Sequence, residues 1–91
     1  MDGTGYVTVE FFGVPRWRAG RAELHVAAGT VRDLLAAIEG ACPGLAGLLQ
    51  PEGRLAPHYL LSLDGQRFVS DLAQNLQPGD RVLLLSADAG G

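Results

Sequence analysis

The most informative stretch of the sequence is residues 78–86, Pro-Gly-Asp-Arg-Val-Leu-Leu-Leu-Ser. The Pro-Gly pair favours a type II turn, because glycine readily takes the positive φ that the third turn position needs. Residues 81–86 follow as a strand, and the apolar run 82–85 predicts a strand that is covered on both faces. Such a strand lies in the middle of a sheet, so the earlier segments are expected to flank it.

The N-terminal third predicts a hairpin. Residues 6–13 alternate apolar and polar positions, the pattern of a strand with one buried face. Phe12 interrupts the alternation by placing an aromatic ring on the otherwise polar face. Residues 23–27 form a second, shorter strand, and residues 16–21 are interpreted as a loop that turns at Gly20.

A helix is predicted after this hairpin. Thr30 is a good N-cap, and Asp33 three residues later gives the spacing of a capping box. The helix ends at Pro43-Gly44, and residues 44–49 predict one further helical turn. One apolar stripe with the helical period faces the core: Val31, Leu34, Leu35, Ile38 and Cys42.

A second hairpin precedes the last strand. Residues 58–64 and 66–69 are predicted to pair through Asp64-Gly65, a dipeptide typical of a type I′ turn. Residues 70–77 form an irregular segment that contributes leucines to the core.

Two hairpins with a helix between them and a final strand predict an α+β fold. The last strand is expected beside the first, parallel to it, in the centre of a mixed sheet of four or five strands. One main helix crosses one face, which is the β-grasp arrangement of ubiquitin. Residues 1–86 are expected to form this domain, and residues 87–91 a flexible tail.

Composition excludes several classes of protein. The chain has 91 residues and 47% hydrophobic residues, which is typical of one globular domain. The first five residues have neither the basic nor the apolar region of a signal peptide, no apolar run is long enough to span a membrane, and the single cysteine cannot form an internal disulfide. These features predict a cytoplasmic protein with no membrane partner.

All seven basic residues are arginine, and the chain has no lysine. Only three arginines cluster, within residues 16–21, and the formal net charge is −3, so we expect no nucleic-acid partner. The chain also has no side-chain amine that could accept an isopeptide bond from another copy of itself.

The sequence contains no recognisable catalytic or metal-binding set, so we do not expect an enzyme. His25 and His58 have no metal-ligand spacing, and each is interpreted as a structural or surface residue. Cys42 lies on the apolar stripe and is interpreted as a small core residue rather than a reactive thiol. Trp17 lies between arginines, and either caps the core or contacts a partner.

The chain ends in Gly90-Gly91, after three other short residues. A frayed end without function is one interpretation. The other is that the Gly91 carboxylate is the reactive group. Glycine has no Cβ, so such an end can enter a narrow channel where an enzyme activates the carboxylate.

The whole pattern resembles the MoaD/ThiS family of ubiquitin-like sulfur carrier proteins. The resemblance covers nearly the whole chain. It depends on four stretches: Val-Thr-Val-Glu-Phe-Phe-Gly at 7–13, Gly-Thr-Val-Arg-Asp-Leu-Leu at 29–35, Leu-Gln-Pro-Gly-Asp-Arg-Val at 76–82, and Gly90-Gly91.

The resemblance implies a non-enzymatic carrier that binds no cofactor. An adenylating enzyme of the ubiquitin-activating type would use ATP to adenylate Gly91, and a sulfur donor would convert the AMP ester to a thiocarboxylate. The acceptor would be a biosynthetic enzyme for molybdopterin, cysteine, thiamine or another sulfur metabolite, and the role of small subunit in a synthase such as molybdopterin synthase also fits. The alternatives are a ubiquitin-like modifier conjugated through Gly91 and an adaptor whose tail is inert.

A partner surface is predicted on the sheet face away from the helix. Phe12 points to that face. In the last strand, either Val82 and Leu84 or Leu83 and Leu85 must point to the same face as Phe12. The predicted partner contacts are Phe12, Leu83, Leu85 and Ala89, and the predicted reactive terminus is Gly90 and Gly91.

Overall fold

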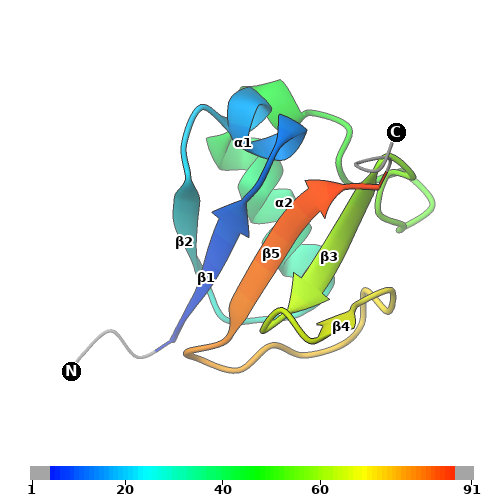
Figure 1. Ribbon diagram of the computed structural model, residues 1–91. Helices are drawn as coiled ribbons and strands as arrows, with labels where there is room; N and C mark the ends of the chain where they lie inside the picture. The colour runs from blue at the N-terminus through cyan, green and yellow to red at the C-terminus, as the bar shows by residue number, and fades with distance from the viewer. Residues whose placement is uncertain (1–4, 88–91) are drawn as a thin grey trace.

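The computed structural model describes residues 5–87. These residues form a five-stranded sheet with a main helix across one face (Figure 1). The strands are β1 (Tyr6–Phe11), β2 (Glu23–Ala27), β3 (Tyr59–Leu63), β4 (Arg67–Phe68) and β5 (Arg81–Ser86). The helices are α1 (Val14–Ala19), the main helix α2 (Val31–Ala41) and the 3-10 turn η1 (Pro43–Leu45).

The last strand is central, as the sequence predicted. The strand order is β2-β1-β5-β3-β4. β5 pairs parallel with β1, where Phe11 lies opposite Leu84, and antiparallel with β3, where Leu61 lies opposite Leu84. The β-grasp prediction is therefore confirmed, with five strands. No helix among the described residues is long and apolar enough to cross a membrane.

The helix forms where the sequence places it, because its N-terminus is capped. The Asp33 N–H donates to Thr30 Oγ1 at 3.2 Å, and the Thr30 N–H donates to Asp33 Oδ2 at 3.0 Å. This is a complete capping box, which satisfies two backbone donors that the first turn cannot satisfy itself. All five members of the predicted stripe are buried: Val31, Leu34, Leu35, Ile38 and Cys42.

Both predicted turns have the expected geometry. Asp64 and Gly65 have φ values of 55° and 70°, as a type I′ turn requires. Gly79 has φ 93°, and the Asp80 N–H donates to the Gln77 carbonyl at 2.9 Å, which is a type II turn. Some predicted elements are longer than the observed ones, since β1 ends at Phe11, β3 covers 59–63, β4 covers 67–68 and η1 ends at Leu45.

The prediction of a loop over residues 16–21 is wrong, because most of this segment is α1. Pro15 lies in the first turn, where its missing N–H costs nothing, and Gly20 ends the helix with φ 73°. The Gly20 N–H donates to the Arg16 carbonyl at 3.0 Å. A proline in the first turn and a glycine just after the last turn are typical of a helix, and this signal could have identified α1.

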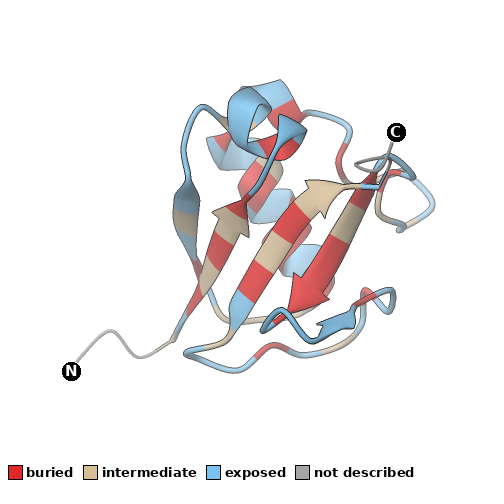
Figure 2. Ribbon diagram, in the orientation of Figure 1, coloured by how far each residue is buried: buried red, intermediate tan, exposed pale blue. Residues whose placement is uncertain are grey.

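The prediction that β5 is covered on both faces is also wrong. Val82 and Leu84 are fully buried beneath α2, whereas Leu83 and Leu85 are only half-buried. Figure 2 shows this alternation along β1 and β5, and no helix of the described residues covers the second face. We call this uncovered side of the sheet the open face.

Gly44 fixes the position of α1. A Cβ added at Gly44 would lie 2.1 Å from the carbonyl oxygen of Arg18 in α1, and a backbone atom cannot move aside cheaply. We therefore expect Gly44→Ala to lower the free energy of unfolding by about 1–3 kcal/mol, as overpacking does. Urea denaturation measures this change.

Gly40→Ala is the matched control. Gly40 is in α2, and a Cβ there has no neighbour within 4 Å. The control should stabilise the protein by up to about 1 kcal/mol, because alanine favours a helix over glycine. Equal effects of the two variants would contradict the close contact between α1 and η1.

Candidate functional site

Five apolar side chains lie on the open face. We call them the open-face patch: Phe12, Leu60, Phe68, Leu83 and Leu85. Phe12 is 45% exposed and Phe68 is 65% exposed, while the three leucines are half-buried. Exposed apolar clusters of this kind usually mark an interface with another molecule.

The strand register brings these residues together. Leu85 lies opposite Leu60, and cross-strand partners share one face of a sheet. Leu83 lies opposite Ser62, which in turn lies opposite Phe68. The Phe12 N–H donates to the Leu84 carbonyl at 3.1 Å, so that β1 continues beside the end of β5.

A charged pair bounds the patch toward the start of β5. Arg81 Nη1 forms an ion pair with Glu10 Oε2, and both side chains are partly exposed. Glu10 lies opposite Leu83 in the register. The open face therefore has an apolar half near the end of β5, which holds Phe12, Leu60 and Leu85. Nearer the beginning of β5, Leu83 and Phe68 share a row with Glu10 of the charged pair.

The chain leaves the sheet at the apolar half. β1 and β5 are parallel, so Phe12 and Leu85 lie at the edge where β5 ends at Ser86. The Ala87 N–H donates to the His58 carbonyl at 2.7 Å. The predicted site residues Ala89, Gly90 and Gly91 and most of the predicted tail lie outside the described residues. A chain of four residues beyond Ala87 spans at most about 14 Å.

A hollow of about 270 Å³ lies beside the end of β5. Its lining includes Val14, Arg18, His58, Tyr59 and Ser86. Arg18 Nη1 donates to Tyr59 Oη at 2.8 Å, which joins α1 to β3. The element that carries Arg18 is thus fixed to the sheet near the root of the tail.

The structure therefore brings together Phe12, Leu83 and Leu85, as expected, and adds two residues that the sequence analysis missed. Leu60 could have been found from the strand pattern, because Tyr59, Leu61 and Leu63 on the core face leave Leu60 on the other face. Phe68 is placed opposite Ser62 by the tight Asp64-Gly65 turn.

The other candidate residues do not form a site. His25 and His58 are exposed, and within residues 5–87 no group of three or more His, Cys, Asp or Glu side chains is placed to hold a metal ion. Trp17 is 82% exposed and does not cap the core. Cys42 is 1% exposed, as expected of a core residue.

Because Cys42 is buried in the core, we expect it to be dispensable for the sulfur transfer that the resemblance to the MoaD/ThiS family implies. Cys42→Ser should lower the free energy of unfolding by about 1–2 kcal/mol, since a buried hydroxyl without a partner is unfavourable. Thiocarboxylate formation on the folded variant, measured by intact mass, should equal that of the unchanged protein. A folded variant that forms no thiocarboxylate would instead indicate a persulfide on Cys42.

No protein-family model matches the chain, and no curated protein matches it. Solved structures do match, over nearly its whole length. The HVO 2177 protein of Haloferax volcanii is 31% identical over 100% of this chain and 91% of its own, with a TM-score of 0.78. SAMP1 of the same organism, the small archaeal modifier protein 1, is 26% identical over 96% of this chain and 100% of its own, with a TM-score of 0.80.

A chain of the BexX/CysO complex of Amycolatopsis orientalis has the same fold, with 24% identity, coverage of 93% of this chain and 99% of its own, and a TM-score of 0.77. Molybdopterin-converting factor subunit 1 and Urm1 are also among the matches. The printed names among these matches include a modifier and a subunit of molybdopterin-converting factor.

The sheet order, the central parallel strand and the crossing helix define a ubiquitin-like β-grasp protein. The chain belongs to the MoaD/ThiS family of ubiquitin-like sulfur carrier proteins.

Proposed function

We propose that this chain carries sulfur as a thiocarboxylate on Gly91. One observation supports the proposal most: the central strand β5 ends beside the open-face patch, at the edge where the parallel strand β1 also ends. A partner that binds the patch is therefore placed within reach of the Gly-Gly terminus. The patch holds the protein, and the terminus enters the partner's reaction site.

The activation step needs ATP and an adenylating enzyme. A Gly91 carboxylate oxygen attacks the α-phosphorus of ATP, a P–O bond forms, and pyrophosphate leaves. A hydrosulfide equivalent from the sulfur donor then attacks the carbonyl carbon, a C–S bond forms, and AMP leaves with the electron pair of the C–O bond. The carrier contributes the carboxylate, while the enzyme stabilises the charge that develops.

The delivery step regenerates the carrier. The thiocarboxylate sulfur attacks an electrophilic carbon of the substrate held by an acceptor enzyme. A C–S bond forms, the bond from that carbon to its leaving group breaks, and the leaving group departs with the electron pair of that bond, which gives a thioester. Water hydrolyses this thioester, which returns the Gly91 carboxylate and leaves the sulfur on the product. An acceptor in molybdopterin, cysteine, thiamine or other sulfur metabolism fits this chemistry.

One relative favours a second function. SAMP1 is named a modifier, and an adenylated Gly91 can equally acylate the lysine amine of a target protein. Because this chain has no lysine, such a modifier would add to its targets as single copies rather than as lysine-linked chains of itself.

Intact-mass spectrometry of the protein isolated from its native host tests the proposal. A sulfur carrier should show the mass change of one oxygen exchanged for one sulfur, located at Gly91. Higher-mass conjugates that survive reduction would identify the modifier instead. An unmodified carboxylate under every growth condition would contradict both functions and leave an adaptor with an inert tail.

A further inference from the structure

A second surface lies on α1, apart from the open-face patch. Trp17 is the only tryptophan of the chain and is 82% exposed, more than any other large hydrophobic residue among those described. Beside it lies a hollow of about 500 Å³ lined by Gly13, Arg16, Trp17, Gly20, Arg21 and Ala22. We call Arg16, Trp17, Arg21 and this hollow the Trp17 surface.

The helix below Trp17 is firmly held. Pro15 is buried, Arg18 donates to Tyr59 Oη, and the Arg18 carbonyl lies against Gly44 without room for a Cβ. Trp17 is thus presented outward on an element that is fixed on its other side. An indole side chain has only two rotatable side-chain torsions, so it loses little conformational freedom when a partner covers it.

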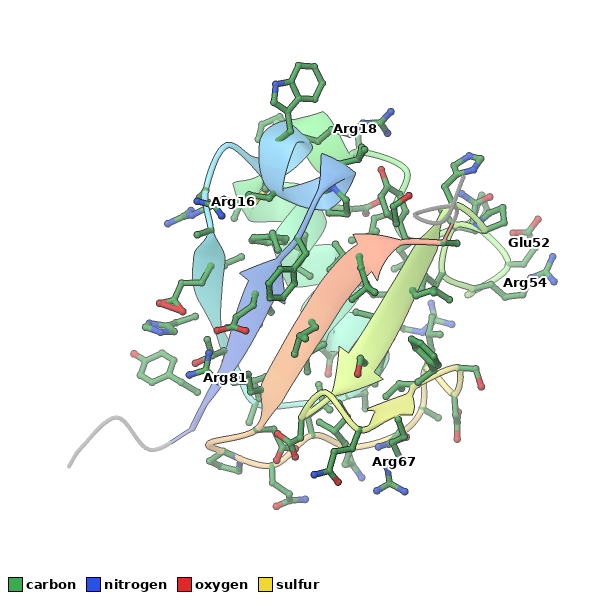
Figure 3. The ribbon with its side chains drawn as sticks, in the orientation of Figure 1. Arg16, Arg18, Glu52, Arg54, Arg67 and Arg81 are labelled. Carbon is green, nitrogen blue, oxygen red and sulfur yellow. The ribbon has the colours of Figure 1, made fainter. Side chains whose placement is uncertain are left out.

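The Trp17 surface is locally positive on an acidic protein. Residues 11–22 contain three arginines and no Asp or Glu, whereas the rest of the chain has four arginines and ten carboxylates. Arg16 and Arg21 are exposed, and neither side chain has a hydrogen bond or ion pair within residues 5–87. Figure 3 shows Arg16 and Arg18 projecting from opposite sides of α1.

The Trp17 surface also adjoins the open face. A neighbouring hollow of about 200 Å³ shares Arg16 and Ala22 with the first and reaches Phe12. Glu10 and Glu23 line this second hollow, so the positive region ends there. A partner bound at Phe12 can therefore extend a segment over the end of the sheet to Trp17.

We propose that the Trp17 surface binds an acidic segment of a partner protein. One apolar side chain of the segment packs on the indole, and carboxylates on either side of it pair with Arg16 and Arg21. Tryptophan and arginine are the residues that most often dominate binding energy at interfaces. A nucleic acid fits less well, because three arginines offer few phosphate contacts and the net charge of −3 repels the backbone. The proposal does not depend on any reaction at Gly91.

The single tryptophan reports binding directly. The probe is a synthetic peptide of Asp and Glu with one central Leu, titrated into the full chain while Trp17 fluorescence is recorded. We expect a saturable blue shift of the emission, because the exposed indole leaves water, and weaker binding at high salt. A peptide with Lys in place of Asp and Glu should give no shift.

Charge-reversal variants locate the site. Arg21→Glu should weaken binding about tenfold, since an attraction becomes a repulsion next to the bound segment. Arg67→Glu is the matched control, because it makes the same change of charge on β4, at the other end of the molecule (Figure 3). This control should change the affinity for the peptide by less than about twofold at physiological salt. Both residues are exposed, so thermal melts should show folded variants.

Three results would overturn the proposal. One is an emission spectrum that does not change at millimolar acidic peptide. Another is an equal loss of affinity in Arg21→Glu and Arg67→Glu, which would show attraction to the whole molecule rather than to this surface. The third is tighter binding of polyuridylate RNA than of the acidic peptide, which would identify a phosphate-bearing partner.

Discussion

A chain that lacks Gly90 and Gly91 should be adenylated at least about a hundredfold more slowly than the full chain, with its melting temperature nearly unchanged. The deletion moves the terminal carboxylate back to Ala89, by up to about 7 Å of chain, and misplacement of a reacting atom by far less already costs rate. Stability should not change, because residues 87–91 have no large side chain to bury.

ATP–pyrophosphate exchange with the cognate adenylating enzyme, run beside thermal melts, measures both quantities. Deletion of Met1 and Asp2 is the matched control, since it removes two residues from the opposite end. That control should exchange at the normal rate. Normal exchange by the chain without its glycines would mean that Gly90-Gly91 is a frayed end and that the sulfur-carrier proposal fails.

Phe12→Asp should weaken binding of the adenylating enzyme by roughly a hundredfold, in the range found for central interface residues. Phe12 lies at the end of β1 beside Leu85, where a partner that covers the open-face patch would have to remove water from the new carboxylate. Phe12 is not in the core, so the fold should persist.

Tyr6→Asp is the matched control for Phe12→Asp. Tyr6 is 53% exposed and lies on the same face of β1 at its other end, beyond the ion pair of Glu10 and Arg81.

Calorimetric titration gives the dissociation constants of both variants. Exchange kinetics then distinguish weaker binding, expected for Phe12→Asp, from a misplaced terminal carboxylate, expected for the deletion of Gly90 and Gly91. A high concentration of Phe12→Asp should restore the exchange rate, because its terminus is intact, whereas no concentration should rescue the deletion. Unchanged binding of Phe12→Asp would remove the open-face patch as the binding site.

Local signals account for the parts of the fold that the sequence predicted well. The capping box of Thr30 and Asp33 and the turns at Asp64-Gly65 and Pro78-Gly79 each act over four residues or fewer. Their geometry depends on the residues themselves and little on the rest of the chain. The helix stripe and the strand alternation then assign one side of each element to the core.

α1 was missed because distant residues hold it. Six residues form an unstable helix alone, so the short-range signals at Pro15 and Gly20 are weak, and the sequence predicts a loop over residues 16–21. The contacts that fix the helix come from Gly44 and from Tyr59, which lies 41 residues beyond Arg18. No local pattern encodes such a contact.

The open face shows a second reason why the sequence alone could not predict the whole structure. The run 82–85 is apolar at every position, and composition does not distinguish a surface covered by the chain's own helix from one left for a partner. Only the sheet topology separates Val82 and Leu84, beneath α2, from Leu83 and Leu85 on the open face. The register then adds Leu60 and Phe68 to the same patch.

The central position of β5 also affects how the protein is made on the ribosome. Each hairpin, β1 with β2 and β3 with β4, can form as soon as it emerges, but β1 and β3 have no direct ladder between them. The sheet closes only after Ser86 has left the exit tunnel, because β5 joins both halves through its parallel pairing with β1 and its antiparallel pairing with β3. Pairing between segments so far apart in sequence is the slow part of folding. Nascent chains cut short before β5 would therefore expose both strand edges, which makes them substrates for proteolysis and aggregation rather than for any partner of the finished carrier.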